Sequence, residues 1–132
     1  MSASLLNFPI FYFSVLHIYE PVPEFYDKLK NVWSDHVQNN QWTVNVHNFG
    51  LGDSTRTIFL SEADIKGQGT FGMEDNLSNE KKIPLGIIDA TTAFNNVTGG
   101  VKDLDLLHVN CEGCEYEMLE NIIKSNLHLK IK

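Results

Sequence analysis

Three short polar motifs each follow an apolar run with the character of a β-strand. They are Glu20-Pro21, Gly50-Leu51-Gly52-Asp53 and Asn110-Cys111-Glu112-Gly113. In an open parallel sheet, ligands bind beyond the carboxyl ends of the strands, because loops and helix N-termini converge there. We therefore expect the functional site of this chain where these three strands end.

The first two motifs suit the two halves of a nucleoside. The carboxylate of Glu20 matches a ribose diol, because its two oxygens can accept from two adjacent hydroxyl groups. The same position suits equally well an acid that caps, or favours the dipole of, a helix starting near Pro23. The Gly50–Asp53 motif would let the backbone approach a flat base while Asp53 accepts a hydrogen from an exocyclic amine. On local grounds a hairpin turn is the stronger interpretation of this glycine motif.

Cys111 and Cys114 have the C-x-x-C spacing and lie between a strand and a helix N-terminus, a placement that activates a thiol in thioredoxin-like proteins. The aromatic and Gly-Pro neighbours of thioredoxin motifs are absent, so thiol–disulfide redox chemistry is kept as an alternative. We expect both thiols to be packing residues. Zinc is less favoured still, because further ligands would have to come from isolated histidines such as His108 or His47.

Hydrophobic periodicity predicts the elements that would position these motifs. Strands are expected at 14–19, 42–49, 55–60, 85–90 and 104–110, and helices at 23–37 and 113–125. The 104–110 run reads as the most buried strand of the chain, and we expect it to lie centrally with Val15–Tyr19. The apolar stretch 4–19 favours a buried strand over a targeting segment or a membrane span.

Two further features of the pattern concern a loop and a helix face. Residues 61–82 show no helical or strand period, which predicts a flexible loop or lid. The last helix carries Tyr116, Leu119, Ile123 and Leu127 along one stripe, with Met118 and Ile122 beside it. The final residues, 129–132, read as the entry to another strand.

Composition limits the class of protein and of partner. The chain has 132 residues, of which 42% are hydrophobic and 20% charged, so we expect one globular domain with room for at most about five strand–helix units. Seventeen acidic against ten basic side chains give a net charge of −7, which disfavours nucleic acid and anionic membranes as partners. Two cysteines are too few for a secreted disulfide framework, which favours a reducing, cytoplasmic compartment.

Three segments together resemble FkbM-type methyltransferases. HIYEPVPEF at 17–25 resembles their strand-to-helix segment, FGLGD at 49–53 their "a-l-G-d" segment, and DLLHVNCEGCEYEML at 105–119 their "DllKiDvEGaE.evL" signature. Order and spacing agree, and the resemblance spans about residues 15–125. It implies one S-adenosylmethionine-dependent methyltransferase domain over residues 1–132, acting on oxygen of a small molecule or a glycan.

The resemblance also implies the site. It assigns Glu20 to the ribose, Gly52 and Asp53 to the adenine, and Asn110 and Glu112 to the methyl-transfer site. An amide orients a hydroxyl group but cannot take its proton, so a general base would be Glu112 or His108. No glycine-rich loop precedes Ser14 and the family's last strands have no counterpart. We therefore expect a partial Rossmann-type α/β fold with a mostly parallel sheet and flanking helices, and weak cofactor binding. A non-catalytic binding protein derived from this fold is a further alternative.

Overall fold

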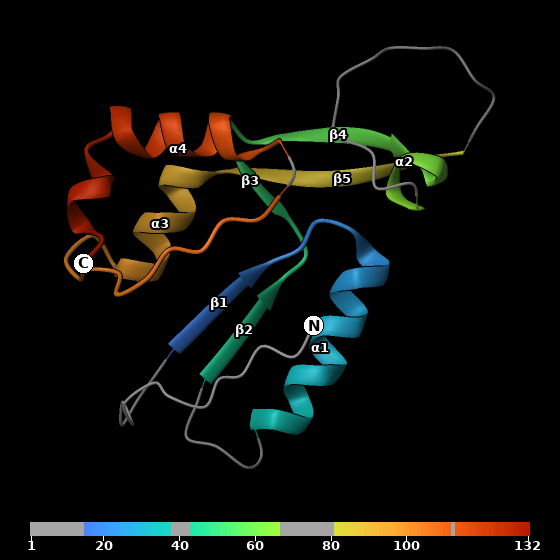
Figure 1. Ribbon diagram of the computed structural model, residues 1–132, viewed down its shortest axis with the longest axis horizontal. Helices are drawn as coiled ribbons and strands as arrows, with labels where there is room; N and C mark the ends of the chain where they lie inside the picture. Colours follow the sequence, from blue (N-terminus) through green and yellow to red (C-terminus); the bar gives the residue numbers. More distant parts are fainter. Residues whose placement is uncertain (1–14, 38–42, 67–80, 112) are drawn as a thin grey trace.

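The computed structural model describes residues 15–37, 43–66, 81–111 and 113–132 (Figure 1). Its elements are β1 (Val15–Tyr19), α1 (Pro23–Val37), β2 (Thr43–His47), β3 (Gly50–Gly52), β4 (Arg56–Ser61), α2 (Glu62–Lys66), β5 (Lys82–Asp89), α3 (Ala90–Thr98), α4 (Glu115–Lys124) and the 3-10 helix η1 (Leu127–Lys130). The α/β class is confirmed.

The described strands form two sheets. β1 and β2 pair in parallel, from Val15 beside Thr43 to Tyr19 beside His47. In the second sheet β5 is central, with β3 parallel on one side and β4 antiparallel on the other. The parallel pairing that was expected thus holds within the first sheet and between β3 and β5, while β4 makes the second sheet mixed. β1 has β2 as its strand neighbour among the described residues, so its expected central position is not found there.

The glycine motif forms a strand, and the prediction of a hairpin turn was wrong. Gly50–Gly52 is β3, and it pairs with β5 at Ile87–Asp89. β2 and β4 are not paired with each other; the chain bends at residues 53–55 instead and enters β4 on the far side of β5. The motif is part of a sheet because its backbone groups pair with those of β5.

The 104–110 run was expected to be the most buried strand, and this prediction was wrong. Only Leu104 makes a β-bridge, with Ile131, and residues 105–111 form no strand. Leu106 is 71% exposed, while Leu107 and Val109 pack against the core. A strand needs a hydrogen-bonded neighbour, and among the described residues none lies along this segment beyond that bridge, so apolar character alone does not make it one.

Helix α3 (Ala90–Thr98) was missed, because the sequence analysis expected a strand at 85–90 and no helix after it. The carboxylate of Asp89 caps the helix by accepting from the Thr91 backbone N–H at 2.7 Å. Gly99 ends it in the left-handed conformation. Ala90, Ala93 and Phe94 are buried at helical spacing, so the signals of a short amphipathic helix were present in the sequence.

The core lies between α3, α4 and η1. It contains Ala90, Phe94, Met118, Ile122 and Leu127, and Leu51, Leu104, Leu107, Val109 and Ile131 pack against it. The helix at 115–124 was predicted correctly, but not its buried face: Met118 and Ile122 are 3% exposed, whereas Tyr116 is 83% exposed. The segments that fold against α4 meet the Met118 side, which periodicity alone could not determine.

Part of the expected loop at 61–82 is ordered secondary structure. Ser61 ends β4, the short helix α2 follows, and Lys82 opens β5; residues 67–80 lie outside the described residues. Ser61 and Asp64 cap α2 reciprocally: the Ser61 hydroxyl accepts from the Asp64 N–H at 3.1 Å, and the Asp64 carboxylate accepts from the Ser61 N–H at 3.1 Å.

Candidate functional site

A cavity of about 800 Å³ brings the three polar motifs together. Glu20 and Pro21 reach it from the end of β1, Gly50 and Leu51 from β3, and residues 107–111 from the segment that precedes α4. Apolar side chains of β4, β5 and α4 complete much of its wall, among them Ile58, Ile87 and Met118. Segments up to 100 residues apart in the chain, from Ile18 to Met118, therefore share one concave site, of a size usual for small-molecule ligands.

Glu20 lies at the junction between β1 and α1. Its Oε1 accepts from the Val22 backbone N–H at 2.8 Å, next to the start of α1 at Pro23. Among the described residues no hydrogen bond reaches its Oε2. Burial raises the pKa of Glu20 above its ordinary value, and the Val22 hydrogen bond offsets part of that rise. One carboxylate oxygen thus orders the strand-to-helix turn while the other is left for a ligand.

The glycine motif meets the cavity through Gly50 and Leu51, and Gly52 and Asp53 are not among its lining residues. Asp53 pairs with Arg56 instead, accepting from Nη1 at 2.7 Å. A Cβ on Gly50 would lie 2.9 Å from the Ile87 side chain, so the glycine is what lets β3 sit this close to β5 and to the cavity.

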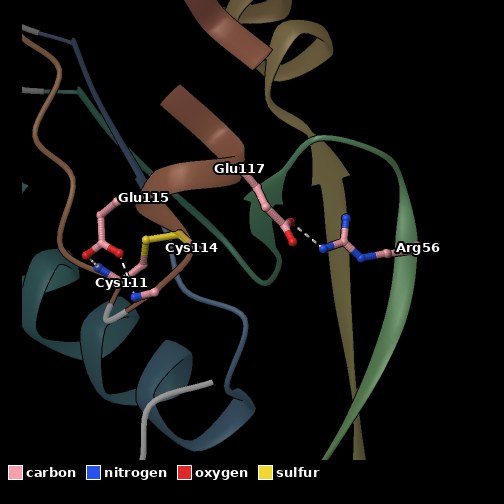
Figure 2. The surroundings of a disulfide bond; sticks show 6 residues. Arg56, Cys111, Cys114, Glu115 and Glu117 are labelled. Carbon is pink, nitrogen blue, oxygen red and sulfur yellow. Dashed lines mark hydrogen bonds and ion pairs between the residues drawn. A yellow bond between two sulfur atoms is a disulfide. The ribbon is translucent and has the colours of Figure 1, made fainter. Parts of the chain in front are cut away.

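An ion pair that the sequence interpretation overlooked spans the cavity wall. Arg56 on β4 donates through Nη2 to Glu117 Oε2 on α4 at 2.6 Å, and both residues line the cavity (Figure 2). Hydrogen bonding to Glu117 is the main cause that raises the pKa of Arg56. Arg56 is the chain's sole arginine and lies in a strand of alternating polar and apolar residues. These two features could have marked it in the sequence as a candidate site residue.

The residues expected beside the methyl-transfer site come from the segment before α4. Asn110 and His108 both line the cavity. Glu112, the other predicted catalytic residue, lies outside the described residues. A hydroxyl-bearing ligand in the cavity would therefore meet an amide that can orient it and an imidazole that can accept a proton.

Cys111 and Cys114 are joined by a disulfide (Figure 2), whereas the sequence interpretation took them as reduced packing residues. Both are half-buried and both line the cavity. The Glu115 carboxylate accepts from the backbone N–H groups of Cys111 at 3.2 Å and Gly113 at 2.5 Å. The turn into α4 is thus held twice, by the sulfur bridge and by a carboxylate.

A second polar cluster lies on the β1–β2 sheet. His17 Nδ1 and His47 Nε2 are 3.0 Å apart, and Tyr19 stacks on His47. Burial is the main cause that lowers the pKa of both histidines. In the described part of the chain, no three His, Cys, Asp or Glu side chains are grouped so as to hold a metal ion.

No described helix is both long and apolar enough to cross a membrane. Comparison of the chain with protein-family models, with curated protein sequences and with solved structures finds no match in any of the three. The resemblance to FkbM-type methyltransferases therefore rests on the sequence motifs, and it enters the proposal below on that footing.

Proposed function

We propose that this chain is an FkbM-type, S-adenosylmethionine-dependent methyltransferase domain of Rossmann type that methylates oxygen of a small molecule or a glycan. The observation that supports it best is the meeting of all three family-like motifs at one cavity, through Glu20, Gly50 and Asn110. A common ligand requires its contacting residues to share one site, and these motifs do so although they lie far apart in the chain.

The lining suits the nucleoside end of the cofactor. Glu20 has one carboxylate oxygen bound to Val22 and one directed to no described partner, which fits an acceptor for a ribose hydroxyl. The backbone at Gly50 and Leu51, with Ile87 behind it, offers a flat and largely apolar surface to a base. The cavity volume of about 800 Å³ lies within the range of roughly 300–1,000 Å³ usual for such ligands.

Bound S-adenosylmethionine would supply an electrophilic methyl group. The chain's own residues then have to orient the acceptor and take its proton. Asn110 orients the acceptor hydroxyl through its amide, and His108, a neighbour in the same wall, accepts the proton. Asp53 is engaged with Arg56 outside the lining, so base recognition falls to the strand backbone.

The test is a titration of isotope-labelled protein with S-adenosylmethionine, followed by amide shifts in nuclear magnetic resonance spectra. We expect shifts at Val22, Gly50 and Leu51. Binding without the hydrogen bonds that a glycine-rich loop gives to the methionine end, at about 0.5–1.5 kcal/mol each, should have a dissociation constant about tenfold to a thousandfold above that of a site with such a loop.

The carboxylate is tested by substitution. Glu20→Gln should weaken binding about tenfold, because a charge-assisted hydrogen bond to the ribose is replaced by a neutral one. Glu24→Gln, which removes an exposed carboxylate paired with Lys28, is the matched control and should leave the affinity unchanged. Adenosine should compete in the wild type, and 2′,3′-dideoxyadenosine should compete equally weakly in wild type and Glu20→Gln.

Two results would overturn the proposal. One is an absence of shifts at the cavity residues; the other is an equal affinity of Glu20→Gln and the Glu24→Gln control. Transfer is measured separately, with a labelled methyl donor and hydroxyl acceptors of small-molecule and glycan type. Binding without transfer to any of them would favour the alternative of a non-catalytic binding protein.

A further inference from the structure

The Cys111–Cys114 disulfide is a feature that methyl transfer does not use. It joins two residues three positions apart in the sequence, just before α4, with their Cα atoms 5.4 Å apart, and both cysteines line the cavity. A role as a structural staple explains it poorly. The stabilisation from a cross-link grows with the length of the loop that it closes, and a four-residue loop lies at the short end of that relation.

The turn does not depend on the sulfur bridge for its shape. The Glu115 carboxylate binds the backbone N–H groups of Cys111 and Gly113. On the helix side, the Cys114 carbonyl accepts from the Met118 N–H at 3.1 Å, and Met118 is buried in the core. None of these contacts involves a sulfur atom, so breaking the S–S bond removes none of them directly, and we expect the two thiols to stay close enough to join again. Such persistence is what a reversible dithiol pair requires.

Glu115 also influences whether the disulfide or the dithiol form of the cysteine pair is favoured. Backbone N–H groups at the start of a helix normally stabilise a thiolate. Here the carboxylate of Glu115 takes two such groups in the turn, one at Cys111 and one at Gly113, and brings its own negative charge (Figure 2). Both effects disfavour a thiolate in the turn. The reduced state gains little stabilisation, and a pair of this kind gives up its electrons readily.

We propose that Cys111 and Cys114 form a thiol–disulfide exchange site whose reduced form donates two electrons to disulfide substrates. One cysteine thiolate attacks a substrate sulfur, which forms a mixed disulfide and releases the other substrate sulfur as a thiolate that takes up a proton. The second cysteine loses its proton and attacks the cysteine sulfur of the mixed disulfide, and the substrate sulfur released there takes up a proton. The Cys111–Cys114 bond forms, and the substrate leaves as a dithiol. A small dithiol such as dithiothreitol returns the pair to the reduced state by the reverse exchange.

The first experiment measures the equilibrium. The full chain is equilibrated with dithiothreitol at stepped ratios of reduced to oxidised form, quenched in acid and alkylated, and the number of labelled thiols is read by mass spectrometry. We expect molecules with none or two labels. Glu115→Gln keeps an acceptor for the backbone but removes the charge, so the dithiol fraction at a given ratio should rise about twofold to fivefold, the effect of one charge at a helix terminus. Glu120→Gln, on the exposed face of the same helix and paired with Lys124, is the control and should not move it.

The second experiment measures exchange. With dithiothreitol as the electron source, the chain should accelerate reduction of the insulin interchain disulfides severalfold over dithiothreitol alone, and Cys111→Ser with Cys114→Ser should abolish the acceleration. Equal circular dichroism of the reduced wild type and the oxidised form is expected, because the turn is held by Glu115 and by the Cys114 carbonyl.

Each of three outcomes would overturn the inference. The first is a native chain whose two thiols are both alkylated in the absence of reductant. The second is the same dithiol fraction in Glu115→Gln as in Glu120→Gln. The third is insulin reduction by the wild type no faster than by the double serine variant. None of these measurements involves S-adenosylmethionine, so the exchange site and the proposed methyltransferase function can fail independently.

Discussion

Replacing Gly52 by alanine should destabilise the fold through one identifiable contact. A Cβ at this position in β3 would lie 2.9 Å from Ile87 Cγ2 and 3.1 Å from Arg56 Nη1. Ile87 is buried, and its Cγ2 is attached directly to Cβ, so this methyl group cannot swing aside as the end of a long side chain would. The strand must instead move away from β5, or the Arg56 ion pairs must rearrange.

The magnitude follows from comparison with a glycine that has room. Forcing an extra carbon into a packed contact costs about 1–3 kcal/mol. At Gly86 in β5 the nearest atom to a new Cβ is Phe49 Cβ at 3.7 Å, an ordinary contact. Gly86→Ala should therefore be neutral or stabilise by about 0.4–1 kcal/mol through the lower entropy of the unfolded chain. The two variants should differ by about 1–4 kcal/mol.

Urea unfolding followed by circular dichroism measures this difference. With a slope of about 2 kcal/mol per molar urea, Gly52→Ala should unfold at a midpoint lower by about 0.5–1.5 M, and Gly86→Ala at or above the wild-type midpoint. Gly50→Ala should fall between them, because its closest contact is with the terminal Cδ1 of Ile87. Equal midpoints for the Gly52 and Gly86 variants would refute the packing argument.

Three further predictions concern a cap, a pH dependence and an ion pair. Asp89→Ala removes a carboxylate that caps α3, so urea unfolding should show a loss of about 1–2 kcal/mol, and a loss near zero would contradict the capping role. Because burial lowers the pKa of His17 and His47 below 6.5, the unfolded chain binds protons first, and the free energy of unfolding should fall as the pH drops below that value. The double variant with glutamine at both positions should show a flatter pH profile, and a profile as steep as that of the wild type would count against this explanation. Arg56→Met leaves the half-buried carboxylate of Glu117 without its cation and should lower the free energy of unfolding by about 1–3 kcal/mol. Lys28→Met, at an exposed ion pair, should lower it by less, and equal losses in the two variants would contradict this prediction.

Local signals were sufficient for several elements. The strand at Val15–Tyr19 and the helices at Pro23–Val37 and Glu115–Lys124 were predicted close to their actual bounds. Each carries its own period, and the prolines after Tyr19 mark the change from strand to helix. The helix after Asp89 could have been predicted in the same way, from its capping aspartate and from the helical spacing of its apolar residues. It was missed because the strand predicted at 85–90 overlaps its first residue.

The residues that line the cavity could be predicted only in part, because only some of them carry a local sequence signal. Motifs such as Glu20 and Asn110 could be recognised because they follow apolar runs, and both line the cavity. The pairing of Arg56 with Glu117 could not be predicted, because the two residues are 61 positions apart and meet only in the tertiary structure, where α4 packs against β3. Nor does the C-x-x-C spacing alone show whether Cys111 and Cys114 form a disulfide or remain two reduced thiols.

The sequence by itself determined which segments favour strand or helix, where polar residues follow apolar runs, and the net negative charge. Only the tertiary structure decided that Gly50–Gly52 is a strand beside β5, that residues 105–111 are not a strand, and that α4 buries Met118 while it exposes Tyr116. The physical reason is common to all three. Helical bonds join neighbours in sequence, whereas strand pairing and the choice of a buried face depend on partners that distant segments supply.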